Sequence, residues 1–461
     1  MKTGNPTLTD RLLISWYGDD FTGASAVMEV LTLAGLPAVL FLDVPTPALL
    51  ARFSQYRALG VAGISRSKSP EWMEAHLPKI FNTLASWHTP ITHYKTCSTL
   101  DSAPHVGSIG KATELALPYF EHSWVPVLTA APAIHRYQLF GNLFACNQGT
   151  GYRLDRHPTM SRHPVTPMME ADVRVHLSQQ TDIPIGLIDY PSLAAGAGAS
   201  SLDKEIEAGH RLIAIDVVDE ASLIEAGRLI WCNREKGAFA VGSQGIEYAL
   251  IAYWRSVAAL PTNAPSARAA PVERIVVVSG SCSPVTAGQI DWARAHGFEL
   301  IRVDVRKALD ERTWQRVIAE ATDAAVRAID GGRDPLVYSA RGPDDPAIRT
   351  LSEAVDVSGG DIRSVNERIG TGLGKVLDST LKKTRLRRGV IAGGDTSGYG
   401  AQVLGIQALT LKAPIVPGAA LFLAHSDDIA YADIEIALKG GQMGPPDYFG
   451  QIKHGGAVAH Y

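Results

Sequence analysis

Short apolar runs alternate with amphipathic stretches over most of this chain, a pattern that favours α/β domains with mainly parallel sheets. The first repeat predicts a strand at 12–16 and a helix at 22–34, which Gly35 ends. Similar apolar runs predict further strands in the first half, at 37–43, 59–64, 91–95, 124–128, 212–217 and 238–241.

The second half repeats this pattern after a change in composition. Residues 258–271 are rich in Pro, Ala and Ser and predict a linker. Strands are then predicted at 275–278, 300–305, 336–339, 390–392, 413–417 and 434–438. We therefore expect two α/β domains with mainly parallel sheets, over 1–257 and 272–461, and an active site in the cleft between them.

Composition and charge exclude several classes of protein. The formal net charge of -4 gives no reason to expect a nucleic-acid or membrane partner. The four cysteines lie far apart without paired spacing, which fits a reducing compartment. The N-terminus lacks the apolar core of a signal peptide, and no run approaches the ~20 apolar residues of a membrane span. We expect a cytoplasmic protein, and its oligomeric state stays open, with a homodimer as one possibility.

Polar segments follow three predicted strands of the first domain. Asp19 and Asp20 follow the first strand, Arg66 follows the third, and Lys95 begins the polar segment 95–102 after the fourth. Open α/β sheets bind their ligands at the carboxyl ends of their strands, so we expect these side chains to meet at one edge. An aspartate pair is also a common helix N-cap, and the segment around Arg66 could be an ordinary solvated loop.

Glycine-rich turns join strands to helices in the second domain. The clearest, Gly393–Gly400, precedes a helical pattern that continues to Leu411. Two further turns contain Ser281 and the pair Gly440-Gly441. Free N–H groups at a helix N-terminus attract an anion, and glycine lets the backbone approach a phosphate closely. An ordinary β-turn-α connection is the alternative for any one of these turns.

Two other segments carry less information. Residues 370–376, GTGLGKV, do not form a P-loop, because that motif needs Gly and Ser or Thr where Ile369 and Val376 stand. The stretch 141–167 is rich in Gly, Pro, His and Arg, and we expect an irregular lid that contacts substrate. Its histidines lack metal-ligand spacing.

These parts together favour a phosphoryl-transfer enzyme. Such an enzyme needs a phosphate cradle, an acid near the acceptor hydroxyl, cations for an anionic acceptor, and Mg²⁺. Asp395 and Thr396 are suited to a metal and a nucleotide, or to helix capping. A non-catalytic sugar-acid sensor would have little use for phosphate turns, and an NAD-dependent oxidoreductase would need a GxGxxG that the first β-α turn lacks.

The sequence also resembles the four-carbon acid sugar kinase family over nearly its whole length. The resemblance rests on short segments in the same order: GDDFTGA (18–24), SRS (65–67), YKTCST (94–99), SGSCSPVTAGQI (279–290), GGDTSGYG (393–400), PG (417–418) and LKGGQMG (438–444). It implies ATP-dependent phosphorylation of a small aldonic or oxo-aldonic acid, such as threonate, erythronate, their 3-oxo forms or a branched oxo-sugar acid. It also implies that the first domain binds the acid and the second binds ATP.

The resemblance further implies roles for single residues. Asp19 and Asp20 would contact the acid, and we favour Asp20 as the base. Other contacts to the acid would come from Arg66, Lys95, Cys97, Ser98 and Thr99, and we expect Arg66 to pair with its carboxylate. ATP would contact Ser281, Gly393, Gly394, Asp395, Thr396, Gly440 and Gly441. Many members have Asp and then Arg where this chain has Cys97 and Leu100-Asp101, so the identity of the acid stays open.

Overall fold

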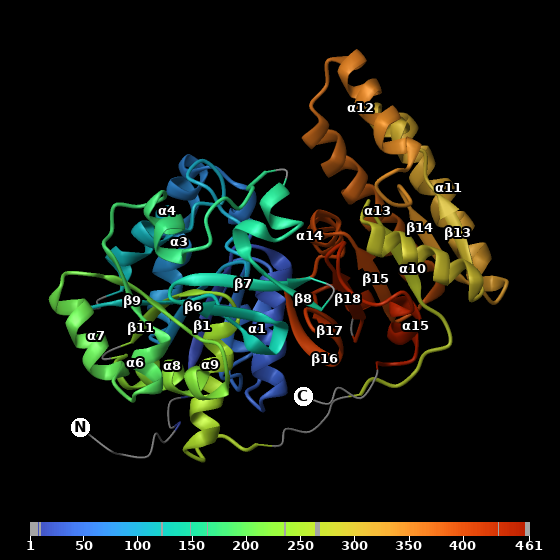
Figure 1. Ribbon diagram of the computed structural model, residues 1–461. Helices are drawn as coiled ribbons and strands as arrows, with labels where there is room; N and C mark the ends of the chain where they lie inside the picture. The colour runs from blue at the N-terminus through green and yellow to red at the C-terminus, as the bar shows by residue number, and fades with distance from the viewer. Residues whose placement is uncertain are drawn as a thin grey trace. The chain divides into compact units, whose positions relative to one another are not determined.

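The computed structural model describes residues 8, 11–120, 123–147, 149–163, 165–234, 237–262, 268–431 and 433–456. The chain divides into two compact units, Met1–Pro265 and Ser266–Tyr461 (Figure 1). The middle of the predicted linker, 263–267, lies outside the described residues. No helix in the described ranges is long and apolar enough to cross a membrane.

The first unit contains a parallel sheet in the strand order β2-β3-β1-β4-β11-β5-β10-β9. The strands are β1 (Ile14–Gly18), β2 (Ala38–Phe41), β3 (Ala58–Ala62), β4 (Ile91–Lys95), β5 (Val125–Leu128), β9 (Ile185–Ile188), β10 (Leu212–Ile215) and β11 (Ala238–Gly242). In this unit, Figure 1 shows helices on both faces of the sheet. They are α1 (Phe21–Leu33), α2 (Pro47–Ala51), α3 (Pro70–Ser86), α4 (Ile109–Ala116), α5 (Val173–Ser178), α6 (Tyr190–Ala194), α7 (Gly198–Glu207), α8 (Glu220–Cys232) and α9 (Gly245–Ser256).

Helix α3 illustrates how the sequence pattern produces this packing. Its buried residues recur at helical spacing and form one apolar face, made of Met73, Leu77, Phe81 and Leu84. This face packs in one core cluster with Tyr17 of β1 and Tyr94 of β4. Each such side chain contributes about 1.5–3 kcal/mol when it leaves water, so the helix is held to the sheet mainly by apolar burial.

The prediction of an irregular segment at 141–167 was wrong for its first part. Strands β7 (Asn142–Asn147) and β8 (Thr150–Arg153) lie there and form a small antiparallel sheet with β6 (Arg136–Leu139). Leu143 and Ala145 are buried and alternate with more exposed neighbours, the signature of a half-buried strand. Only short 3₁₀ turns, at Leu154–Arg156 and Met160–Arg162, appear in the part described beyond β8.

The second unit contains a sheet in the order β13-β14-β12-β15-β18-β17-β16, in which β17 alone runs antiparallel to its neighbours. Its strands are β12 (Val276–Ser279), β13 (Phe298–Arg302), β14 (Asp334–Tyr338), β15 (Arg388–Ala392), β16 (Ala408–Val416), β17 (Ala419–His425) and β18 (Glu435–Lys439). Its helices are α10 (Pro284–Ala295), α11 (Glu311–Asp330), α12 (Pro346–Ser358), α13 (Ile362–Thr384), α14 (Gly394–Val403) and α15 (Tyr448–Lys453). The prediction of mainly parallel α/β sheets is thus confirmed.

Two details of the second unit bear on the sequence analysis. The predicted helix that reached Leu411 was too long, because Gly405 ends it in a left-handed conformation (φ 59°) and Leu411 lies in β16. The rejected P-loop segment lies inside α13, where its glycines allow close packing against other helices. A Cβ on Gly372, for example, would lie 2.5 Å from the Trp314 ring nitrogen.

Candidate functional site

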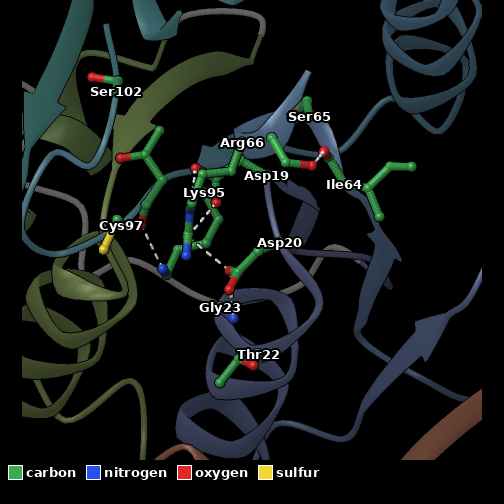
Figure 2. A network of polar contacts seen from close by, with 12 residues as sticks. Asp19, Asp20, Thr22, Gly23, Ile64, Ser65, Arg66, Lys95, Cys97 and Ser102 are labelled. Atoms are coloured by element: carbon green, nitrogen blue, oxygen red, sulfur yellow. Dashed lines mark hydrogen bonds and ion pairs between the residues drawn. The ribbon is translucent and has the colours of Figure 1, made fainter. Parts of the chain in front are cut away.

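The three polar strand ends of the first unit meet at one edge of its sheet, as predicted. In the strand register, Gly18 at the end of β1 lies opposite Ala62 of β3 and Lys95 of β4. The backbone N–H of Asp19 donates to Lys95 O (2.9 Å), and the N–H of Arg66 donates to Asp19 O (3.0 Å). Because these strands are direct neighbours, the polar residues that follow them share one small region (Figure 2).

Arg66 clamps both aspartates. Its Nε and Nη2 donate to the two carboxylate oxygens of Asp19, at 3.1 and 2.6 Å, and Nη2 also donates to Asp20 Oδ1 at 2.7 Å. This planar two-bond pairing is the geometry that we expected Arg66 to offer to the sugar acid. Nη1 makes no hydrogen bond to the described residues, so it is the part of the guanidinium that a substrate could use.

The two aspartates differ in their surroundings. Asp20 is the N-cap of α1, and its Oδ1 accepts from the Gly23 N–H at 2.8 Å. Its side chain is 28% exposed, and within the described part of the chain its Oδ2 has no hydrogen-bond partner. The side chain of Asp19 is 1% exposed, and burial raises its pKa against the opposing attraction of Arg66. A ligand can therefore reach Asp20 more easily than Asp19.

Lys95 places a buried ammonium group beside this pair. Its Nζ donates to Thr96 O at 2.6 Å, and burial lowers its pKa. A Cβ on Gly23 would lie 2.5 Å from Asp20 Oδ1 and 3.0 Å from Lys95 Nζ. A side chain at Gly23 would therefore displace the Asp20 carboxylate and the Lys95 ammonium from their present positions.

The segment after β4 brings the other predicted contacts into the same region. Cys97 Sγ lies 3.1 Å from the hydroxyl of Thr99, which is buried, whereas Ser98 is partly exposed. Two residues further along, Asp101 accepts a hydrogen bond from Thr166 Oγ1, which ties the segment beyond β8 to this strand end. The segment is thus anchored beside the candidate site.

The three glycine turns of the second unit also meet. Their strands β12, β15 and β18 are direct neighbours, with Ala392 opposite both Ser279 and Lys439. Gly280 N donates to Ala392 O (3.0 Å), and Gly393 N donates to Lys439 O (2.9 Å). The predicted phosphate turns therefore lie side by side at the carboxyl edge of this sheet.

Close contacts require glycine at several of these positions. A Cβ on Gly280 would lie 2.2 Å from Thr396 Oγ1, and one on Gly441 would lie 2.7 Å from Ser281 Oγ. Gly393 has a φ of 120°, which side chains rarely adopt. Gly394 differs, because a Cβ there would meet nothing within 4 Å and would point into open space. A side chain at Gly394 would therefore point away from the rest of the protein.

The donor set fits Mg²⁺ that arrives with a nucleotide. No cluster of three or more His, Cys, Asp or Glu that could hold a metal is found in the described ranges. Mg²⁺ bound with ATP usually needs only one or two carboxylates, since phosphates and water complete its shell. Asp395 is exposed in the first turn of α14 and forms no ion pair with the described residues, so it is suited to this role.

Sequence reasoning gave no role to two cations that the structure brings to these regions. Lys439 is buried beneath the turn at 440–441, and its position directly before the glycine pair was the available signal. Among the described residues, Arg136 of β6 has no carboxylate partner, and its Nε is buried without an acceptor. Strand β6 pairs with β7 in a hairpin, and the sequence analysis missed this hairpin because it expected an irregular segment at 141–167.

Comparisons with known proteins agree with this division of roles. Residues 14–250 match a family described as a sugar-binding N-terminal domain, and residues 276–449 match one described as a nucleotide-binding C-terminal domain. A 3-oxo-isoapionate kinase from Paraburkholderia graminis is 47% identical over 96% of this chain and 94% of its own length. A 3-oxo-tetronate kinase from Cupriavidus necator is 28% identical over 96% and 97%. A solved structure from Haemophilus influenzae has a TM-score of 0.72 at 25% identity, over 95% of this chain and 99% of that one.

Proposed function

Because this chain belongs to the four-carbon acid sugar kinase family and is an ATP-dependent kinase of a small oxo-sugar acid, we propose that its acceptor is a branched 3-oxo acid of the isoapionate type. The observation that carries this choice is the 47% identity to a 3-oxo-isoapionate kinase, against 28% to a 3-oxo-tetronate kinase of similar coverage. Cys97 supports it, because an uncharged thiol stands where many members of the family have an aspartate.

The sugar acid is held by the strand ends of the first unit. Its carboxylate pairs with the Lys95 ammonium and with the free Nη1 of Arg66, both of which lie beside Asp20. The partly exposed hydroxyl of Ser98 is available to its polar groups, and buried Thr99 contributes through its contact with Cys97 Sγ at 3.1 Å. Asp19 acts on Arg66 rather than on the acid, because it fixes the plane of the guanidinium through two hydrogen bonds.

Asp20 accepts the proton of the acceptor hydroxyl. The hydroxyl oxygen forms a bond to the γ-phosphorus of ATP, the bond from that phosphorus to the β–γ bridging oxygen breaks, and ADP leaves. The proton moves to Asp20 Oδ2, the carboxylate oxygen without a hydrogen-bond partner in the described ranges. The bonds from Gly23 and Arg66 to Oδ1 hold the carboxylate in place during this step.

MgATP is the second substrate, and its phosphates lie on the turns of the second unit. Backbone N–H groups at Gly394 and Asp395, in the first turn of α14, and the hydroxyls of Ser281 and Thr396 form the cradle, with Gly440 and Gly441 on its other side. Asp395 would hold Mg²⁺, whose charge stabilises the transferring phosphoryl group. Transfer requires the acceptor in the first unit to reach the γ-phosphate bound by the second.

Acceptor choice is tested by kcat/KM for branched and linear 3-oxo acids, followed as ADP release from MgATP. We expect the branched acid to be preferred, and a preference for linear 3-oxo-tetronate would overturn the proposal.

Cys97→Asp should lower kcat/KM for the branched acid by about 10-fold or more, because it places a new carboxylate beside the acceptor. Cys97→Ser keeps the size and neutrality of the side chain and should change it little.

Arg66→Lys should raise KM for the sugar acid by about 10-fold or more while KM for ATP stays near its wild-type value, because a lysine cannot hold both aspartates in a planar two-bond pair. Arg153→Lys is the matched control, since Arg153 makes a similar pair with Asp155 (2.7 Å) at the surface of the same unit. Equal rises in both KM values would place Arg66 in the fold or in the nucleotide site instead.

A further inference from the structure

Lys439 is a buried cation without a counter-ion among the residues that the structure describes. It is the last residue of β18, its side chain is almost fully buried, and in the described ranges it makes no ion pair. Its ammonium donates one hydrogen bond in those ranges, to Thr286 Oγ1 at 3.0 Å. A buried charge without a partner lowers the stability of the fold, so proteins rarely keep one unless a ligand supplies the opposite charge.

The contacts of Lys439 lead to the glycine turns. Thr286 Oγ1, which accepts from the ammonium, donates in turn to the carbonyl oxygen of Gly441 at 2.9 Å, and Ser283 Oγ donates to the same oxygen. The backbone carbonyl of Lys439 accepts from Gly393 N at 2.9 Å. One residue thus supports the turn at 440–441 through its side chain and the turn at Gly393 through its backbone.

We propose that Lys439 is a positioning residue for ATP. Its ammonium supplies the positive charge beneath the phosphates and, through Thr286, holds the 440–441 turn in the conformation that binds ATP. This inference rests on the proposed placement of ATP at these turns. The phosphates provide the negative charge that the described residues do not place beside Lys439. The attraction to phosphate and the shape of the 440–441 turn are linked, because the same ammonium is responsible for both.

Proton uptake on ATP binding follows from this arrangement. Burial lowers the pKa of Lys439 to about 8. Bound phosphates favour the charged form and raise this pKa again, so ATP binding takes up a proton at pH values above about 8.

Few other titratable groups face the ammonium. Tyr448 of α15 lies with its ring centre 5.9 Å away, and Cys282 is in the adjoining turn, where burial raises the pKa of its thiol. From α10 the facing residue is the neutral Thr286. At the far ends of β15 and β18, Arg388 and Glu435 pair with each other. Cys282→Ser therefore serves as a control for the proton count.

The test measures MgATP binding to the full chain without sugar acid, by calorimetry at about pH 8.5 in two buffers of different ionisation enthalpy. Wild type should take up part of a proton, and Lys439→Met should take up none and bind about 10–100-fold more weakly, the usual loss for a charged hydrogen bond. Lys383→Met, which removes an exposed charge of the same unit, should behave as wild type. Unchanged affinity and proton uptake in Lys439→Met would overturn the inference.

A stability measurement separates this role from a structural one. The unfolded chain holds more protons than the folded one between pH about 8 and the ordinary lysine pKa near 10.4, so wild type should gain stability relative to Lys439→Met as pH rises through this window. At about pH 7 the nucleotide-free variant should melt no lower than wild type, because it lacks a buried unpaired charge. A lower Tm with unchanged ATP affinity would make Lys439 a structural residue.

Two further variants keep the inference testable if Lys439→Met does not fold. Lys439→Arg stays charged at every pH of the assay, so it should bind MgATP but take up no proton. Thr286→Val keeps the ammonium and should weaken binding while proton uptake remains. If Gly394→Val loses ATP binding and the Lys439 variants behave as wild type, the ATP site stands and only this inference is wrong.

Discussion

Asp20→Asn should lower kcat on the order of 10²–10⁴-fold, the usual contribution of general acid–base catalysis, while MgATP binding is preserved. Asparagine keeps the size of the side chain and is itself a good N-cap, so the hydrogen bond from Gly23 and the start of α1 should survive. What it loses is the basic oxygen that would take the hydroxyl proton. Pre-steady-state ADP formation, measured with the sugar acid saturating, reports this step.

Asp19→Asn is the matched comparison, because it makes the same chemical change at the adjacent residue. Asp19 is buried and holds Arg66 by two hydrogen bonds, so this variant should mainly raise KM for the acid and lower the melting temperature. If Asp19→Asn has the larger fall in kcat and Asp20→Asn is nearly normal, the two roles are reversed. Near wild-type kcat in both variants would remove the aspartates from the proton-transfer step.

Gly394→Val should raise the Kd for MgATP by about 100-fold or more, which abolishes binding at ordinary concentrations, while the protein stays folded. A Cβ at this position meets no protein atom within 4 Å, so the valine would occupy the space that we assign to the phosphates. The valine is thus expected to lower the affinity for ATP without disturbing the packing of the protein. Calorimetry with MgATP and far-UV circular dichroism test the two halves of this expectation.

Gly398→Val is the control for Gly394→Val. Gly398 lies one turn further along α14, and a Cβ there also meets nothing within 4 Å. It therefore carries the same helix-propensity cost without lying at the strand end. Full ATP affinity in a folded Gly394→Val variant would move the nucleotide away from this turn.

Much of this site could be predicted because its signals are local. Asp19, Arg66 and Lys95 each follow a short apolar run, and parallel strands bring such positions to one edge of a sheet. The same holds for Ser281, Gly393 and the 440–441 turn, whose strands prove to be direct neighbours.

What could not be predicted depends on partners far apart in the sequence. The pairing of Arg66 with Asp19 crosses 47 positions, and nothing local shows that the guanidinium is already occupied. Strand β7 is a different case, because its partners β6 and β8 are its neighbours in the sequence, and its short alternation was lost among Gly, Pro and His. Lys439 and Thr286 are 153 positions apart, and their contact turns an apparently ordinary strand residue into a candidate for ATP binding.

The most direct test of the whole account is to incubate the purified chain with MgATP and a branched 3-oxo sugar acid, and to quantify ADP and phosphorylated acid by mass spectrometry. The account predicts that both products form in equal amounts. They should not form without the acid, and their formation should be lost in Asp20→Asn and Gly394→Val. Binding of ATP and acid with no ADP above the acid-free control, for branched and linear acids alike, would contradict it.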